Sequence, residues 1–301
     1  MRLTSDEQQA IQSTTEDVNA LDYYLRGREQ YHRTEPGHLE KAREMFEAAI
    51  RCDPDYALAW AGLTYVFVDT YWYHDKEAKW IEQAHEASRK AIELAPQLAE
   101  SHSARGYAFY VHEQFDQAES EFDKAIAINP RLFEPIHFHA QMARILGQYE
   151  KAAHLYCRAA EARTEDYQTL ALGAMMFEYL ADEGRARELH EQFIDRAKRA
   201  LELNPADARA LCLGSLVYLR LGDEKTGLAW LRRAQDASPD SSNVMYNAAC
   251  FHSQSGDLDT ALDCLERAAD LGARNKRMWE LDIDFENIRN HPRFRAVLER
   301  I

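Results

Sequence analysis

The sequence predicts an all-α fold made of seven consecutive helix pairs. Prolines at positions 54, 96, 130, 205 and 239 each end an apolar helical pattern, and Thr164 and Ala273 stand where two more are expected. The intervals between these points are 42, 34, 34, 41, 34 and 34 residues. Proline ends a helix because its ring removes a hydrogen-bond donor and pushes the preceding residue out of the α region. A repeat of about 34 residues is therefore the main feature of the chain.

The period aligns small residues in fixed columns. One column, five residues before the end of each unit, holds only alanine: Ala49, Ala91, Ala125, Ala159, Ala200, Ala234 and Ala268. A second column, near the middle of each first helix, holds only small residues: Gly27, Thr64, Gly106, Ala140, Ala174, Ser215 and Ala249. A further column is mostly bulky, with Phe46, Phe122 and Tyr156 among its members. Two helices approach closely only where neither carries a large side chain, so these columns predict close-packed pairs.

Each unit is expected to consist of a helix, a turn and a second helix. Gly147, Gly222 and Gly256 fall between the two apolar patterns of units four, six and seven, where glycine supplies the left-handed end of a helix. Units two and five are 42 and 41 residues long, and unit one has an extra turn at 33–38. These lengths affect local loops or helices and leave the repeat intact.

The chain ends are expected to cover the apolar faces of the first and last units. Thr4-Ser5-Asp6-Glu7 matches a capping box. Residues 274–301 predict two more helices, the second starting near Pro292, that pack through Trp279, Phe285, Phe294 and Leu298. The predicted organisation is an N-terminal cap at 1–18, seven repeats at 19–273 and C-terminal capping helices at 274–301.

The columns resemble the tetratricopeptide repeat (TPR). Unit three carries the clearest signature, in Gly106, Phe109, Ala118, Phe122, Ala125 and Pro130. The resemblance implies a right-handed solenoid whose first helices line a concave groove. Shorter motifs, at 24–28, 246–250 and 282–294, resemble the TPR arrays associated with bacterial class III adenylate cyclases and winged-helix regulators.

Charge and composition narrow the classes of partner. The formal net charge of −15 repels nucleic acid and anionic membranes, so neither is expected. The longest apolar stretch, Ala57 to Val68, is shorter than the ~20 residues that span a bilayer. The N-terminus lacks an apolar signal core, and the five cysteines are widely spaced. A cytoplasmic protein with reduced thiols is expected.

The resemblance places the partner-binding residues on the first helices of the first four units. The candidates are Tyr24, Arg28, Tyr31, Tyr65, Tyr107, Tyr110, His137, Gln141 and Arg144. Tyrosines interleaved with cationic and polar groups suit an extended peptide with apolar and acidic groups. The alternative, that single tyrosines pack between neighbouring first helices, stays open. Ala61, Tyr65, His137 and Gln141 do not supply the Lys and Asn pattern of the clamp that some TPR proteins use on chaperone C-termini.

The insertion at 70–83 is unusually aromatic for a loop, with Tyr71-Trp72-Tyr73-His74 and Trp80. We expect it to fold back over unit two, with a role in the binding surface as the alternative.

No catalytic or metal-binding motif is recognised. Glu134-x-x-His137 and Glu82-x-x-His85 match the ligand spacing of di-metal bundles, but they fall on a first and a second helix of different units. We therefore expect no enzyme, no metal and no cofactor. The predicted function is an adaptor that binds a protein or peptide in the groove. The alternative is a sensory or dimerising module of a signalling enzyme, such as an adenylate cyclase, for which a homo-oligomer would be expected.

Overall fold

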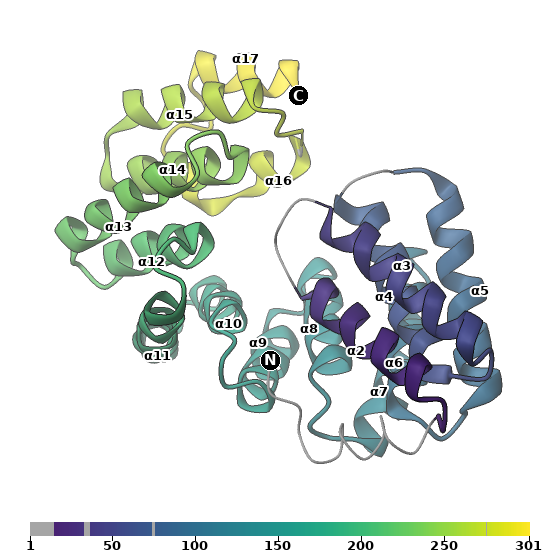
Figure 1. Ribbon diagram of the computed structural model, residues 1–301. Helices are drawn as coiled ribbons and strands as arrows, with labels where there is room; N and C mark the ends of the chain where they lie inside the picture. The colour runs from purple at the N-terminus through teal and green to yellow at the C-terminus, as the bar shows by residue number, and fades with distance from the viewer. Residues whose placement is uncertain (1–14, 33–36, 74–75, 275) are drawn as a thin grey trace. The chain divides into compact units, whose positions relative to one another are not determined.

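The computed structural model describes residues 15–32, 37–73, 76–274 and 276–301 (Figure 1). All regular elements in these ranges are helices, as the repeat predicts. None of the helices among the described residues is both long and apolar enough to cross a membrane. The chain forms two compact units, Met1–Arg163 and Thr164–Ile301. The capping box at 4–7 and most of the extra turn at 33–38 lie outside the described residues.

The first unit contains four helix pairs in chain order. They are α2 (Val18–Tyr31) with α3 (His38–Cys52), α4 (Ala57–Tyr73) with α5 (Ala78–Leu94), α6 (Ala99–Val111) with α7 (Phe115–Ile128), and α8 (Phe133–Ile145) with α9 (Tyr149–Ala162). Each helix packs most extensively against the other member of its pair. The first helices also pack on one another, α2 on α4, α4 on α6 and α6 on α8. They form the continuous row on which the candidate residues lie.

The second unit contains three pairs and a C-terminal cap. The pairs are α10 (Gln168–Tyr179) with α11 (Glu183–Leu203), α12 (Ala208–Arg220) with α13 (Glu224–Ala237), and α14 (Ser242–Ser255) with α15 (Leu258–Asp270). The cap consists of α16 (Lys276–Leu281), the 3₁₀ helix η1 (Ile283–Phe285) and α17 (Pro292–Arg300). Trp279, Phe285, Phe294 and Leu298 are all buried, which confirms their predicted packing role.

The extra residues of the second and fifth repeats lengthen helices instead of forming loops. Residues 70–73 end α4 and residues 78–83 begin α5, so the expectation of a loop at 70–83 was wrong. Trp80 lies 5.9 Å from the ring of Phe67, and Trp72 lies 6.2 Å from that of Tyr110. Trp80 therefore packs within repeat two, whereas Trp72 packs on α6 of repeat three, and both expected roles of this segment stay open. In the fifth repeat the same kind of extension makes α11 a helix of 21 residues.

Small residues face bulky ones within and between the pairs, as the columns predict. A Cβ atom on Gly27 would lie 2.7 Å from the Phe46 ring, and one on Gly106 would lie 2.6 Å from the Phe122 ring. Gly62, which lies outside the columns, approaches the other side of the same contact, with its added Cβ 2.6 Å from Phe46. The ring of Phe46 therefore fits only because α2 and α4 both present glycine to it.

The turns within the pairs share one geometry. Gly147, Gly222 and Gly256 have φ values of 73°, 88° and 86°, which confirms the predicted left-handed helix ends. In the third and fifth repeats Glu113 and Ala181 occupy the same place in the turn, with φ values of 58° and 55°. A side chain in this region strains the backbone.

Candidate binding surface on the first helices

The nine candidate residues all lie in the first unit. Tyr24, Arg28 and Tyr31 come from α2, Tyr65 from α4, Tyr107 and Tyr110 from α6, and His137, Gln141 and Arg144 from α8. The structure brings most of them into two adjoining groups, a polar pocket and a cluster of rings, and Tyr65 belongs to both.

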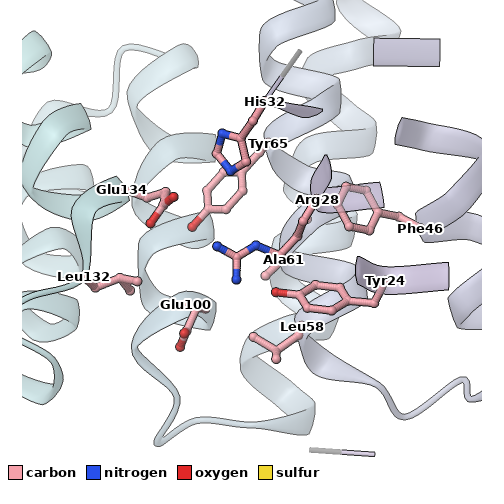
Figure 2. A pocket seen from close by; sticks show the side chains of 11 residues that line it. Tyr24, Arg28, His32, Phe46, Leu58, Ala61, Tyr65, Glu100, Leu132 and Glu134 are labelled. Atoms are coloured by element: carbon pink, nitrogen blue, oxygen red, sulfur yellow. The ribbon is translucent and has the colours of Figure 1, made fainter. Parts of the chain in front are cut away.

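The polar pocket is formed by residues of α2, α3, α4, α6 and α8. It is lined by Tyr24, Arg28, His32, Phe46, Leu58, Ala61, Gly62, Tyr65, Glu100, Leu132 and Glu134. The empty volume between them is about 420 Å³, part of it open to solvent. Figure 2 shows the guanidinium group of Arg28 pointing into this space between Glu100 and Glu134. The hydroxyl group of Tyr65 points to the side of the space where Glu134 lies.

Glu134 is the buried charged group of the pocket. Its Oε1 accepts a hydrogen bond from Nη2 of Arg163 at 2.7 Å, and the Arg163 guanidinium lies 3.8 Å from the centre of the Phe133 ring. Burial raises the pKa of Glu134, but the charges of Arg163 and Arg28 outweigh burial and lower it to about 2. Glu134 is therefore ionised at neutral pH and held by an arginine. Its spacing to His137 in the sequence had suggested only a metal ligand.

The Tyr65 hydroxyl group is buried near the Ser103 side chain, without a hydrogen bond of good geometry to any described residue. Tyr65 is 8% exposed, and its hydroxyl oxygen makes no hydrogen bond within the part of the chain that the structure describes. Burial, and then the charge of Glu134, raises the pKa of Tyr65 well above its usual value, so the hydroxyl keeps its proton. A buried polar group without a partner is rare and costs stability, which makes it a marker of an unfilled site.

The ring cluster consists of Tyr31, Tyr65, Tyr107, Tyr110 and Phe138. Neighbouring tyrosine rings lie with their centroids 6.1 Å apart in the pairs 31–65, 65–107 and 107–110. Phe138 stacks on Tyr107 at 3.7 Å. Tyr107 and Tyr110 are 2% and 4% exposed, and Tyr24 and Tyr65 are 5% and 8% exposed, so packing between helices describes all four rings. Tyr31 is more open.

Asp69 lies within this cluster and was missed by sequence analysis. Its Oδ2 accepts a hydrogen bond from the Tyr31 hydroxyl at 2.8 Å, and its Oδ1 accepts one from the Tyr107 hydroxyl at 2.7 Å. Burial raises the pKa of Asp69 to about 6, against the effect of the two hydroxyl donors. One signal could have revealed it: Asp69 is the only charged residue in α4, ALAWAGLTYVFVDTYWY.

His137, Gln141 and Arg144 follow one face of α8 at a helical spacing. The His137 ring stacks on Phe133 at 5.0 Å, and its Nε2 shares a hydrogen bond of 2.9 Å with Nε2 of Gln141. Nε of Arg144 is buried and makes no hydrogen bond to any described residue. These residues extend the surface along α8 beyond the polar pocket.

Candidate metal ligands have other partners. Glu134 pairs with Arg163, and His85 shares a hydrogen bond of 2.9 Å with His112. In the second unit, single ligand atoms of Cys250, Asp282 and Asp284 lie within 4.8 Å of one another. Asp284 accepts a hydrogen bond from Arg220, and Asp282 accepts one from Tyr246. The absence of a metal, a cofactor and an enzymatic activity stays a prediction.

Two family models match the second unit. Both are described as tetratricopeptide repeat, and they match residues 185–242 and 242–271.

Curated relatives share the repeat over part of their length. Interferon-induced protein with tetratricopeptide repeats 3 from Mus musculus is 28% identical over 158 residues, which are 52% of this chain and 36% of that protein. Anaphase-promoting complex subunit 3 from Schizosaccharomyces pombe is 22% identical over 211 residues, 68% of this chain and 31% of that protein. The chain thus spans about a third of the length of the curated relatives it matches.

Solved structures share the fold at low sequence identity. A tetratricopeptide repeat protein from Parabacteroides merdae superposes with a TM-score of 0.51 at 13% identity, covering 92% of this chain and 98% of that chain. The human IFIT1 dimer with m7Gppp-AAAA superposes with a TM-score of 0.60 at 12% identity, covering 89% and 65%. A capped oligonucleotide in a protein of this fold conflicts with our exclusion of nucleic acid from net charge alone.

The helix pairs, the glycine turns and the family models agree. Residues 185–271 match tetratricopeptide repeat models, and the described residues of the chain form an all-α solenoid of the TPR type.

Proposed function

We propose that the chain is an adaptor that binds a segment of a partner protein along α2, α4, α6 and α8. The observation that carries this proposal is the polar pocket, where the Arg28 guanidinium and the buried Tyr65 hydroxyl face the same open space. Burying polar groups is costly unless they are hydrogen-bonded. A ligand that supplies a partner for the Tyr65 hydroxyl regains that cost on binding.

A peptide fits this surface better than a polyphosphate does. The rings beside the pocket offer contact area to apolar side chains, while Arg28, Glu100 and Glu134 offer both signs of charge to polar ones. A nucleic acid requires a surplus of positive charge, and here two carboxylates oppose one arginine of the lining. We therefore include m7Gppp-AAAA, the oligonucleotide of the IFIT1 structure, as a competing ligand in the binding test.

The alternative module of a signalling enzyme has less support. The motif at 282–294, on which it partly rests, has a structural role, because Phe285, Ile288 and Phe294 are buried in the core of the second unit. We place the adaptor in the cytoplasm, since Cys52, Cys212, Cys250 and Cys264 form no disulfide and Cys52 is exposed.

The test is selection of peptides from a random library displayed on phage, followed by affinity measurement on the enriched sequences. Tyr65→Phe removes only the hydroxyl group, so the ring packing is kept, and we expect binding about 3- to 10-fold weaker, the range of one hydrogen bond. Arg28→Ala should weaken binding further. Tyr218→Phe in the second unit, where the ring packs on Trp230, is the matched control and should bind as the wild type.

Two outcomes would overturn the proposal. One is the absence of any enriched peptide, or equal affinity of wild type and both pocket variants. The other is tight binding of m7Gppp-AAAA that is lost in Arg28→Ala, which would replace a peptide with RNA as the ligand.

A further inference from the structure

Asp69 and the rings around it have the chemistry of a cation receptor. We propose that this carboxylate receives a Lys or Arg side chain of the bound segment, with Tyr31 and Tyr65 forming the walls. The inference rests on the proposed function and names one chemical group that the same surface takes.

The carboxylate is held in one orientation by residues of two neighbouring repeats. The Tyr31 hydroxyl of α2 donates to Oδ2, and the Tyr107 hydroxyl of α6 donates to Oδ1, at 2.8 Å and 2.7 Å. Each carboxylate oxygen has capacity for another hydrogen bond. Asp69 and Tyr31 are both partly exposed, so solvent reaches the residues that carry this remaining capacity.

The charge of Asp69 has no counterion within the described residues. No Lys, Arg or His of α2, α3, α5 or α6 pairs with it, and the titratable groups that contact it are Tyr31 and Tyr107. Glu134 and Asp284, the buried carboxylates of the described chain, each have an arginine within 2.8 Å. A desolvated carboxylate without a cation is costly, and an incoming guanidinium or ammonium group would remove that cost.

The surrounding rings favour a cation for a second reason. The faces of tyrosine rings carry negative potential and attract organic cations within about 6 Å. Tyr31, whose hydroxyl group bonds to the carboxylate, lies 6.1 Å from Tyr65 at an interplanar angle of 30°. A metal ion is a poorer fit, because Ca²⁺ needs six or more oxygen ligands and a single carboxylate lies here.

The test uses two small probes that differ only in charge. N-acetyl-arginine amide and its neutral isostere N-acetyl-citrulline amide are titrated against the full chain at pH 7.5, with binding followed by ligand-observed NMR. We expect the arginine probe to bind at least fivefold tighter in the wild type, and both probes to bind equally weakly to Asp69→Asn. Equal binding of the two probes to the wild type would overturn the inference.

A matched control comes from the second unit. Asp207 also accepts a hydrogen bond from a tyrosine hydroxyl, that of Tyr167 at 3.1 Å, and it begins a helix, a place that Asn fills equally well. Asp207→Asn should keep the preference for the arginine probe. Loss of the preference in this variant as in Asp69→Asn would place the effect outside the ring cluster and overturn the inference.

The pH dependence gives a measurement that needs no variant. The arginine probe stays charged at every pH used, whereas Asp69, with a pKa of about 6, loses its charge below that value. Affinity for the arginine probe should therefore fall about tenfold from pH 8 to pH 5, and affinity for citrulline should not change. A flat profile for arginine would contradict a role for the Asp69 charge.

The peptide selection separates this inference from the proposed function. Enriched peptides that lack Lys and Arg, and bind Asp69→Asn as well as the wild type, overturn the cation receptor and leave the adaptor standing. Probe binding as expected without any enriched peptide supports the receptor and overturns the adaptor.

Discussion

The two units surround a carboxylate between helices in opposite ways. In the second unit Asp284 accepts a hydrogen bond from Nη2 of Arg220 at 2.8 Å, and Nε of the same arginine lies 3.2 Å from Glu178. Glu178 in turn bonds to His190 at 2.9 Å. In the first unit Asp69 has two tyrosine hydroxyls and, among the residues that the structure describes, no cation. Burial raises the pKa of both Asp69 and Asp284 to about 6, but only Asp284 has an arginine of the described chain beside it, so we expect Asp69 to be the one that receives a ligand.

The largest expected effect comes from breaking the complete network. Arg220→Met leaves Asp284 buried and Glu178 largely buried without their common cation, so we expect the second unit to lose about 3 kcal/mol of stability. Urea unfolding gives the free energy. Hydrogen exchange should show faster opening in α10, α12 and η1, the elements that Arg220 joins.

An exposed arginine is the control for this prediction. Arg26 pairs with Asp22 at 2.9 Å, and both side chains are more than half exposed. Arg26→Met should cost less than about 0.5 kcal/mol. If Arg220→Met lowered the free energy of unfolding no more than Arg26→Met does, Arg220 would not stabilise the two carboxylates, and the contrast between the two units would be wrong.

The second effect has the opposite sign and concerns the first unit. Burial raises the pKa of Asp69 to about 6 in the folded chain, above its value in the unfolded chain, so the folded state holds this proton more tightly. The contribution of Asp69 to the free energy of unfolding is therefore fully present below pH 4, and it is lost as the pH rises through 6. Asp69→Asn removes the charge, and we expect it to be about 2 kcal/mol more stable than the wild type at pH 8.

Urea unfolding of both proteins at pH 4.5, 6 and 8 measures this difference. The advantage of Asp69→Asn should grow with pH across that range. A variant that is more stable yet loses the arginine probe would mark Asp69 as a residue kept for binding. An advantage that shrinks as the pH rises would mean that the folded chain stabilises the ionised carboxylate.

The fold was predictable from the sequence because its packing contacts recur with the period of the repeat. The site was not predictable, because its contacts do not follow that period. The contacts of Gly27 with Phe46 and of Gly106 with Phe122 recur at a fixed spacing that the columns reveal. The contact of Asp69 with Tyr31 and Tyr107 joins positions 38 residues apart on either side, because the extra residues at 33–38 and at 70–83 shift both spacings away from the basic period.

Burial was the other quantity that the sequence left open. A tyrosine at a first-helix position faces either the groove or the neighbouring first helix, and the repeat pattern is the same for both. Tyr107 and Tyr110 proved nearly fully buried, whereas Tyr31 is partly exposed. The difference depends on which rings from α4 and α8 lie beside them, and only the folded chain shows this.

The smallest expected effect concerns the turns, where both units carry the same strain. Glu113 in the first unit and Ala181 in the second have positive φ at the place that Gly147 and Gly222 fill in their repeats. Glycine avoids the clash of Cβ in this region but gains entropy in the unfolded chain, so Glu113→Gly and Ala181→Gly should each stabilise by about 0.5 to 1 kcal/mol. Thermal unfolding measures each gain in stability, and hydrogen exchange should show it only in the unit that carries the substitution.

Gly147→Ala serves as the reverse control and should lose a similar amount of stability, because nothing lies within 4 Å of its added Cβ and only the backbone strain changes. A loss in Ala181→Gly would mean that the left-handed turn is not strained, and the entropy of glycine would then be the only difference measured.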